Sequence, residues 1–472
     1  MFNSNNGRLK EIRYAGLRRS YLLWRFCTND FMNSRNLINS RPTVGMIDAD
    51  LIDGGTRHPN LAQMKISSYC KSRGCNVKLL YKTTDLESLN TFDAIIISKV
   101  FTFTKLHPLI SDAMGLDYVS LNRDICEVID LCISGSDKTQ YAIGGTGFFE
   151  NGGRHLDDSI EHIMPDYHLY DEYVDDKLKS GRKRSYFSDY LDFSIGFTSR
   201  GCFRGCEFCV NRFRERRSIK HSPVSEFFDK SRKRIYLWDD NILACKDWEL
   251  ILDELESTGR AFQFRQGMDI RLMSEKKAIR FSKCKYYGDY IFAFDHVDDF
   301  ELIFKKLQMW SKYVKKETKL YLICAFDSFT YTSLDKIKRL NSPYLIKMAE
   351  LPDHRSRELM DIMYLFERIR VCIFCNCLPY VMRYEAYKKS EYKGLYIQIA
   401  RWCNQPSIFK KMSFKEFCFA NQKYSKSGKL CSSMRAYNKI VEDCPEIANR
   451  YFDMKYGMKE TLEKGIWKLD DN

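Results

Sequence analysis

The stretch GFTSRGCFRGCEFCVNR (residues 196–212) restricts the fold of this chain more narrowly than any other part of the sequence. It places Cys202, Cys206 and Cys209 in the spacing C-x3-C-x2-C, directly after the apolar run FSIGFTS at 193–199. Three thiolates on one short loop can surround one soft metal centre. When three cysteines bind a four-iron cluster, one iron stays open to another ligand. A cluster with a cysteine on every iron has no open position.

A structural zinc site is the alternative reading of these cysteines. Zinc prefers four Cys or His ligands in tetrahedral geometry, but the nearest histidine is His221 and no second C-x2-C pair follows at a suitable spacing. Gly201 and Gly205 allow the tight turns that a loop needs in order to wrap a cluster. The pattern therefore favours iron and sulfur over zinc.

Upstream of the loop, apolar runs alternate with helical patterns. The predicted strands are VGMID (44–48), VKLLY (77–81), DAIIIS (93–98) and YAIGG (141–145), with a helical segment at 61–74. Strands alternating with helices indicate a parallel sheet covered by helices. Residues 42–150 are therefore expected to form a Rossmann-like α/β domain, although no G-x-G-x-x-G follows its first strand to support a dinucleotide site.

A second series of strands starts at the cysteine loop. The expected strands are 193–199, 234–241, 261–271, 290–295, 319–327 and 371–384, with helical stretches such as 248–258 and 300–310 between them. Six such units suit an open or partial β/α barrel. We therefore predict a (β/α)6 barrel over 191–384, with an insertion near 328–370.

The remaining segments complete the expected domain organisation. Residues 1–41 resemble a basic N-terminal extension, residues 151–190 a linker with charged turns, and residues 385–472 a mainly helical C-terminal region.

Composition excludes several classes of protein. The chain has 472 residues, of which 44% are hydrophobic, so it can bury a large core and is not a disordered or fibrous protein. It shows no apolar run near the ~20 residues of a membrane-spanning helix and no signal-peptide pattern. We therefore expect a cytoplasmic protein with no membrane partner, whose 18 cysteines are free thiols apart from any that bind a metal.

The net charge of +14 is confined to two stretches. Residues 1–41 carry eight Lys and Arg against two Asp and Glu, and residues 182–234 carry fourteen against six. Such charge indicates either a solvated basic face or a surface that binds a polyanion.

The cysteine loop resembles the signature of radical S-adenosylmethionine (SAM) enzymes, with Phe208 before the third cysteine. The leading TSRGC and the domain order are similar to the subgroup that carries a cobalamin-binding-like domain before the barrel. Further similar segments are YLWDDN (236–241), QGMDIR (266–271), FAFD (292–295), PYVMRY (379–384) and RWCNQP (401–406). The resemblance covers roughly residues 42–420.

The resemblance implies two cofactors, a [4Fe–4S] cluster and SAM, and a role for each matching residue. Cys202, Cys206 and Cys209 would bind three irons, and SAM would be cleaved reductively to a 5′-deoxyadenosyl radical that abstracts hydrogen from the substrate. An external one-electron donor such as flavodoxin or ferredoxin would supply the electron. The implied SAM contacts are Phe208 at the adenine, Asp239, Asp240 and Asn241 at the amino group, and Gln266, Asp269 and Arg271 at the carboxylate and ribose. Asp295 and Asp327 lie at the ends of later strands and would face the same end of the barrel as the SAM contacts. The resemblance assigns them no role.

Cobalamin and an auxiliary cluster are not expected. Cobalamin domains carry D-x-H-x-x-G, which is absent here, and the histidine after the first strand, His58, is followed by proline. The cysteines of CIFCNC (372–377) could join Cys403 in a second cluster, but they lie in an apolar run where buried free cysteine is common.

The substrate class stays open. Modification of RNA or of a peptide is the first hypothesis, because the basic stretches suit a large anionic partner. The alternatives are a non-enzymatic nucleic-acid-binding protein with a structural metal, and a degenerate SAM-fold protein that senses redox state or iron.

Overall fold

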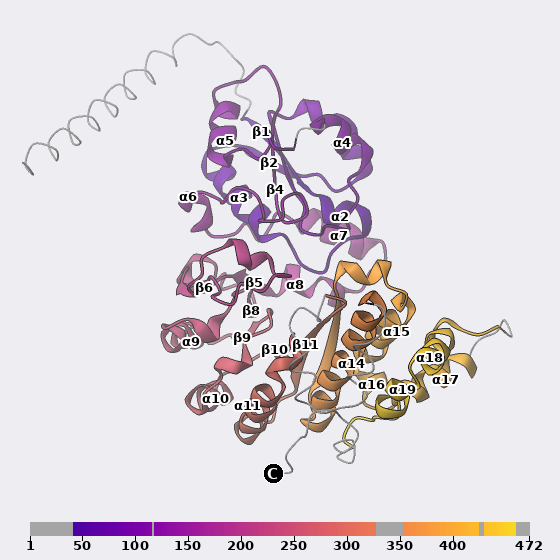
Figure 1. Cartoon of the computed structure of the whole chain (residues 1–472). Helices are drawn as coiled ribbons and strands as arrows, with labels where there is room; N and C mark the ends of the chain where they lie inside the picture. The colour runs from indigo at the N-terminus through magenta and orange to yellow at the C-terminus, as the bar shows by residue number, and fades with distance from the viewer. Residues whose placement is uncertain (1–40, 116–117, 327–352, 424–428, 459–472) are drawn as a thin grey trace, which may run out of the picture.

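The computed structural model describes residues 41–115, 118–326, 353–423 and 429–458, which fold around two series of parallel strands (Figure 1). The first strand series is β1 (Thr43–Asp48), β2 (Asn76–Leu79), β3 (Ala94–Ser98) and β4 (Gln140–Gly144). All four are parallel, in the order β2-β1-β3-β4. Each strand lies within two residues of its predicted bounds, because buried parallel strands appear in sequence as short apolar runs.

Helices cover both faces of this sheet. The two longer ones, α3 (Leu61–Ser72) and α5 (Ile125–Ile133), share a core with one face. The other face is covered by η1 (Thr83–Thr91) and α4 (Pro108–Met114), while the short α2 (Ala49–Gly54) follows β1. The strand order reverses between β1 and β3, which is where doubly wound folds open a crevice at the carboxyl ends of their strands.

The segment 151–190, expected as a linker, is part of this domain. It forms α6 (Asp158–Glu161), α7 (Asp171–Lys179), η2 (Arg184–Phe187) and α8 (Ser188–Leu191). Tyr170, Tyr173, Phe187 and Tyr190 are buried in the core that also holds α3. The expectation was wrong because charged residues dominate the segment, while its aromatic residues supply the buried face.

The second sheet is the predicted open barrel. Its strands are β5 (Phe193–Gly196), β8 (Arg234–Leu237), β9 (Ala261–Phe264), β10 (Tyr290–Ala293), β11 (Thr318–Cys324) and β12 (Leu378–Arg383). They form two parallel three-stranded sheets, β5-β8-β9 and β10-β11-β12. Parallel bridges from Phe262 to Tyr286 and from Met268 to Phe292 join the two halves. The α/β fold class and the six-stranded series are thus confirmed.

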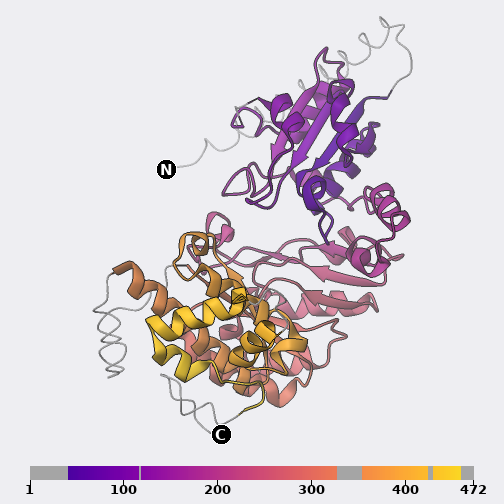
Figure 2. The ribbon, with the colours of Figure 1, turned by 90° about the vertical axis from the view of Figure 1, so that its right-hand side faces the viewer.

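The helices that follow these strands cover the outer face of the barrel. They are α9 (Trp248–Ser257), α10 (Glu275–Ser282), α11 (Phe300–Tyr313), α14 (Asp353–Phe374) and α15 (Lys393–Cys403). The C-terminal helices α16 (Pro406–Phe409), α17 (Phe414–Lys423), α18 (Ser432–Asp443) and α19 (Pro445–Tyr451) continue the same core. In Figure 2 they lie at the end of the molecule away from the N-terminal sheet.

The expected strand 371–384 is in fact the end of a helix, a turn and a strand. Helix α14 runs to Phe374, the chain turns at Asn376 with φ of 54°, and β12 begins at Leu378. The apolar run hid this boundary, because periodicity does not separate a buried helix end from a buried strand. Of the expected insertion 328–370, residues 353–370 belong to this barrel helix, and 328–352 lie outside the described residues together with Asp327 and the extension 1–40.

One carboxylate of the N-terminal domain joins it to the barrel. Glu161 of α6 accepts hydrogen bonds from Lys65 of α3 (3.1 Å) and Arg200 (3.4 Å), and bonds to His221 (3.1 Å). Burial raises the pKa of Glu161, but His221, Lys65 and Arg200 outweigh it, so the pKa lies far below its usual range. Since Arg200 and His221 flank the cysteine segment, the N-terminal domain holds that segment in place.

No helix in the described part of the chain is long and apolar enough to cross a membrane.

Candidate functional site

The cysteine loop lies at the carboxyl edge of the second sheet, directly after β5. A short antiparallel hairpin encloses it, formed by β6 (Ser199–Arg200) and β7 (Ile219–Lys220), with Ser199 paired to Lys220. Ligand sites of β/α folds form at this edge, because the loops after the strands meet there.

Two glycines allow the loop to fold tightly. Gly201 has φ of 94°, and a Cβ there would stand 2.0 Å from the carbonyl oxygen of Arg217. Gly205 has φ of 60°, and a Cβ there would meet the guanidinium of Arg216 at 1.7 Å. Only glycine combines this backbone conformation with such a close approach, so both positions restrict the loop to its observed shape.

The three predicted cysteines are free, partly buried thiols on this loop. The backbone N–H of Cys209 donates to the carbonyl oxygen of Cys206 at 2.9 Å, which turns the chain between them. Burial, followed by the nearby charge of Asp295, raises the pKa of Cys206 to about 11. Across the described residues, no group of three or more His, Cys, Asp or Glu side chains is arranged to hold a single metal ion.

Asp239 follows β8 and binds the chain that leads into the loop. Its carboxylate is buried and accepts hydrogen bonds from the backbone N–H and hydroxyl groups of Thr198 and Ser199, at 2.6–2.9 Å. The neighbouring Asp240 accepts from the N–H of Gly201 at 2.8 Å. The sequence resemblance assigned both acids to the SAM amino group, but their described partners lie in the cysteine segment itself.

Asn241 reaches the first cysteine. Its Nδ2 lies 3.6 Å from Sγ of Cys202, and its side chain is 3% exposed. Its Oδ1 is buried without a hydrogen-bond partner among the described residues. An amide oxygen left in this state has an unused acceptor beside the cysteine loop.

Asp269 and Arg271 form an ion-pair network after β9. Asp269 accepts from Nε of Arg204 on the cysteine loop and from Nε of Arg271, both at 2.6 Å. Arg271 also pairs with Asp299 at 2.5 Å. Burial lowers the pKa of Arg271, but Asp269 and Asp299 outweigh it and raise it above its usual range. The resemblance assigned Arg271 to the SAM carboxylate, but its charge is already balanced by these two acids. Gln266, assigned to the same end of SAM, is exposed to solvent.

Phe208 and Asp295 border the loop from the barrel side. The ring of Phe208 lies 5.3 Å from that of Phe326 and 6.0 Å from that of His296, between their centroids. Asp295 follows β10, and its Oδ1 is buried with no hydrogen-bond partner in the described structure. Burial raises the pKa of Asp295 to about 6, although the nearby charges of Arg368 and Arg271 act in the opposite direction.

The basic run after the loop is largely paired. All of residues 200–220 are described, and their cations with carboxylate partners are Arg200, Arg204, Arg212 and Lys220. Arg216 and Arg217 are exposed. Arg214 fits neither group, because its Nε is buried and no described residue accepts a hydrogen bond from its guanidinium. The sequence left open whether this stretch is a solvated face or a surface that binds a polyanion, and it did not distinguish Arg214 from its neighbours.

The crevice of the N-terminal sheet contains a second perturbed acid. Asp48, at the end of β1, is 2% exposed, accepts from the hydroxyl of Tyr170 at 3.0 Å, and has no described partner for its Oδ1. Burial, with the nearby charge of Asp50, raises the pKa of Asp48 to about 7.

We expect this acid to make stability depend on pH. Between an unfolded pKa near 3.8 and a folded pKa near 7, the unfolded chain releases the proton first, so rising pH lowers the free energy of unfolding. Asp48→Asn should remove this decline, and its stability relative to wild type should grow by roughly 2 kcal/mol from pH 5 to pH 8. Urea unfolding of both proteins at the two pH values measures the difference; parallel pH profiles would contradict it.

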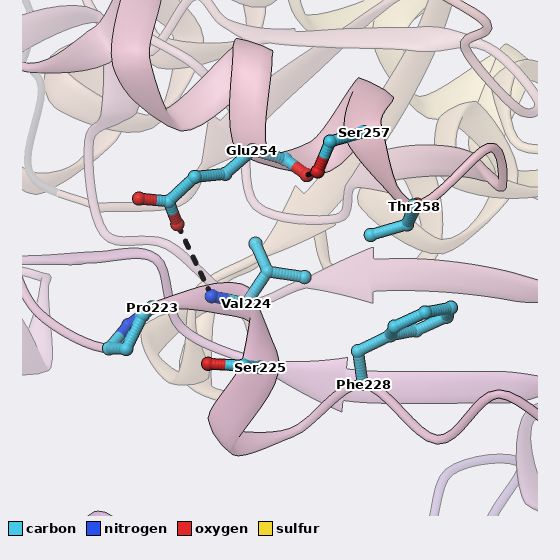
Figure 3. A pocket seen from close by; sticks show the side chains of 7 residues that line it. All are labelled: Pro223, Val224, Ser225, Phe228, Glu254, Ser257 and Thr258. Atoms are coloured by element: carbon cyan, nitrogen blue, oxygen red, sulfur yellow. Dashed lines mark hydrogen bonds between the residues drawn. The ribbon is translucent and has the colours of Figure 1, made fainter.

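A cavity of about 320 Å³ lies between η4 (Val224–Glu226) and α9 (Figure 3). Glu254 points toward it and accepts from the N–H of Val224 at 3.3 Å. The cavity lining contains no residue of the cysteine loop and adds nothing to that site.

The cysteines considered for an auxiliary cluster lie in the core. Cys372, Cys377 and Cys403 are at most 4% exposed and pack among apolar side chains. Burial raises the pKa of Cys375 to about 12 and those of the other three well above the usual value.

Fold and site together define an α/β protein with two parallel sheets and a three-cysteine loop at the carboxyl edge of the second. Solved structures with a similar fold include TsrM from Kitasatospora setae, a radical SAM methyltransferase with cobalamin and a [4Fe–4S] cluster bound. It is 11% identical over 60% of this chain and 70% of its own, with a TM-score of 0.37. Another is OxsB, a cobalamin-dependent SAM radical enzyme, 13% identical over 73% of this chain and 49% of its own, with a TM-score of 0.28.

No family model and no curated protein matches the chain. The proposed function therefore rests on the geometry of this chain's own residues.

Proposed function

We propose that this protein is a radical SAM enzyme that holds a [4Fe–4S] cluster on Cys202, Cys206 and Cys209. The observation that carries the proposal is the placement of three free thiols on one tightly turned loop at the carboxyl edge of a β/α sheet. Thiolate is the ligand of iron–sulfur clusters, and three of them leave one iron open to SAM. When bound and reduced, such a cluster supplies the electron that cleaves SAM to methionine and a 5′-deoxyadenosyl radical, which takes hydrogen from the substrate.

The polar groups around the loop fit the amino end of SAM. An ammonium group needs acceptors, and the buried oxygens Oδ1 of Asn241 and Oδ1 of Asp295 have no described partner. Asn241 lies against Cys202, and the charge of Asp295 raises the pKa of Cys206. These two residues would therefore orient the ammonium beside the cluster, while Asp239 and Asp240 hold the loop.

The substrate and the electron donor are further parts of the proposal. The exposed Arg216 and Arg217 leave positive charge beside the loop, which suits an anionic RNA or peptide, and a flavodoxin or ferredoxin would supply the electron. Cobalamin is not included, because the chain has no D-x-H-x-x-G segment. A preparation grown with cobalamin that carried one corrinoid per chain by absorption would overturn that exclusion.

One assay tests the proposed activity. The protein is reconstituted anaerobically with iron and sulfide, reduced with dithionite, incubated with SAM and analysed by chromatography for 5′-deoxyadenosine. We expect about four irons per chain and 5′-deoxyadenosine that depends on the reductant. Tightly bound zinc with no iron uptake and no cleavage of SAM would favour a structural metal site instead.

A further inference from the structure

Arg214 is a partly buried cation without a counter-ion, in the segment between the third cysteine and β7. It has no ion pair or hydrogen bond among the described residues, and its Nε is shielded from solvent. Burial, followed by the charge of Arg200, lowers the pKa of its guanidinium. A cation removed from water is costly unless an anion pairs with it, so this position suits a bound anionic group.

The two acids whose charges raise the pKa of Arg214 are bonded to other groups. Asp240 accepts from the N–H of Gly201, and Glu161 interacts with Lys65, Arg200 and His221. Neither lies within ion-pair distance of Arg214, although both are near enough to affect its pKa. No described carboxylate pairs with Arg214, so an anionic partner would be a bound group.

Two described segments border Arg214. On one side lies the loop after β4, where Gly152 has φ of 90° and a Cβ would stand 3.5 Å from Nη2 of Arg214. On the other side lies Cys209, whose thiol is close enough to influence the pKa of Arg214. The guanidinium is thus held at the edge of the cysteine loop, where the N-terminal domain meets the barrel.

Resting on the proposed function, we propose that Arg214 binds the carboxylate of SAM. The two unpartnered acceptors at the loop, on Asn241 and Asp295, suit an ammonium, and the unpartnered guanidinium suits a carboxylate. Together they complement the α-amino acid end of SAM, which carries both charges. Arg271, which the sequence resemblance assigned to this role, is already neutralised by Asp269 and Asp299.

The test measures SAM binding rather than turnover. Equilibrium dialysis of the anaerobically reconstituted protein gives dissociation constants for SAM and for decarboxylated SAM in wild type and in Arg214→Met. We expect Arg214→Met to weaken SAM binding by about ten- to a hundredfold, the range of a charge-assisted hydrogen bond. The affinity for decarboxylated SAM should not change, because that ligand has no carboxylate to lose.

The control is Arg182→Met, which removes an exposed arginine of the basic stretch 182–234 and should bind SAM as wild type does. Iron content, circular dichroism and melting temperature confirm that each variant is folded and loaded. If Arg214→Met fails to fold, Arg214→Lys replaces it, with at least a roughly threefold loss for SAM alone expected, since lysine lacks the bidentate fork.

The outcomes separate the two proposals. Wild type that binds SAM, together with an Arg214 variant that binds it equally well, overturns the role of Arg214 alone. Equal losses for SAM and decarboxylated SAM also overturn it, because they show a general disturbance of the site. A loaded wild type that binds no SAM overturns the proposed function, and the role of Arg214 with it.

Discussion

Replacing Cys206 with serine should abolish both the iron–sulfur cluster and the cleavage of SAM. Cys206 is the middle cysteine of the loop, and its backbone carbonyl forms the turn to Cys209, so two thiols without it cannot hold a cubane on three irons. We expect the brown chromophore to be lost, iron to fall from about four per chain to a small fraction of that, and 5′-deoxyadenosine to become undetectable. Absorption, iron analysis and chromatography measure the three quantities.

Cys126→Ser is the matched control for this experiment. Cys126 is also a partly buried free thiol, but it lies on α5 in the N-terminal domain. We expect this variant to take up iron and cleave SAM as wild type does. If both variants retained the cluster, or both lost it, the three-cysteine assignment would be wrong. A Cys206→Ser protein that kept zinc while wild type never contained iron would point to the structural-metal alternative.

Local patterns predicted most strands of the fold. Apolar runs alternating with helical segments placed β1, β3 and β8 within a few residues, because buried parallel strands require such runs. The spacing of the three cysteines predicted a loop at the carboxyl end of a strand, which is where β5 places it.

Contacts between distant segments could not be predicted from such patterns. An acid after a strand looks the same in sequence whether it faces a ligand or binds another loop, and the donors to Asp239 lie about forty positions earlier. The sequence did not reveal that Arg271 pairs with Asp299, because the two residues are 28 positions apart. Arg214 appeared solvated because its neighbours in the run are charged, and only the fold shows that it alone is buried and unpaired within residues 200–220.

The role of Asp239 can be decided by the variant Asp239→Ala. In the structure this carboxylate accepts four hydrogen bonds from Thr198 and Ser199, inside a site where it is 4% exposed. Removing it leaves two backbone N–H groups and two hydroxyls without a partner, and each unsatisfied buried donor is costly. We expect the free energy of unfolding to fall by roughly 3 kcal/mol and iron uptake to fall with it, because the strand end no longer holds the cysteine loop.

A direct SAM contact at Asp239 would give a different pattern. The variant would then unfold and take up iron as wild type does, and only its dissociation constant for SAM would rise. Asp240→Ala is the comparison, since it removes a single hydrogen bond to the N–H of Gly201 and should cost only about 1–2 kcal/mol. Urea unfolding and iron analysis of the two variants beside wild type separate the roles. A stability loss much larger for Asp239 than for its neighbour identifies it as the residue that holds the loop, and leaves the ammonium of SAM to Asn241 and Asp295.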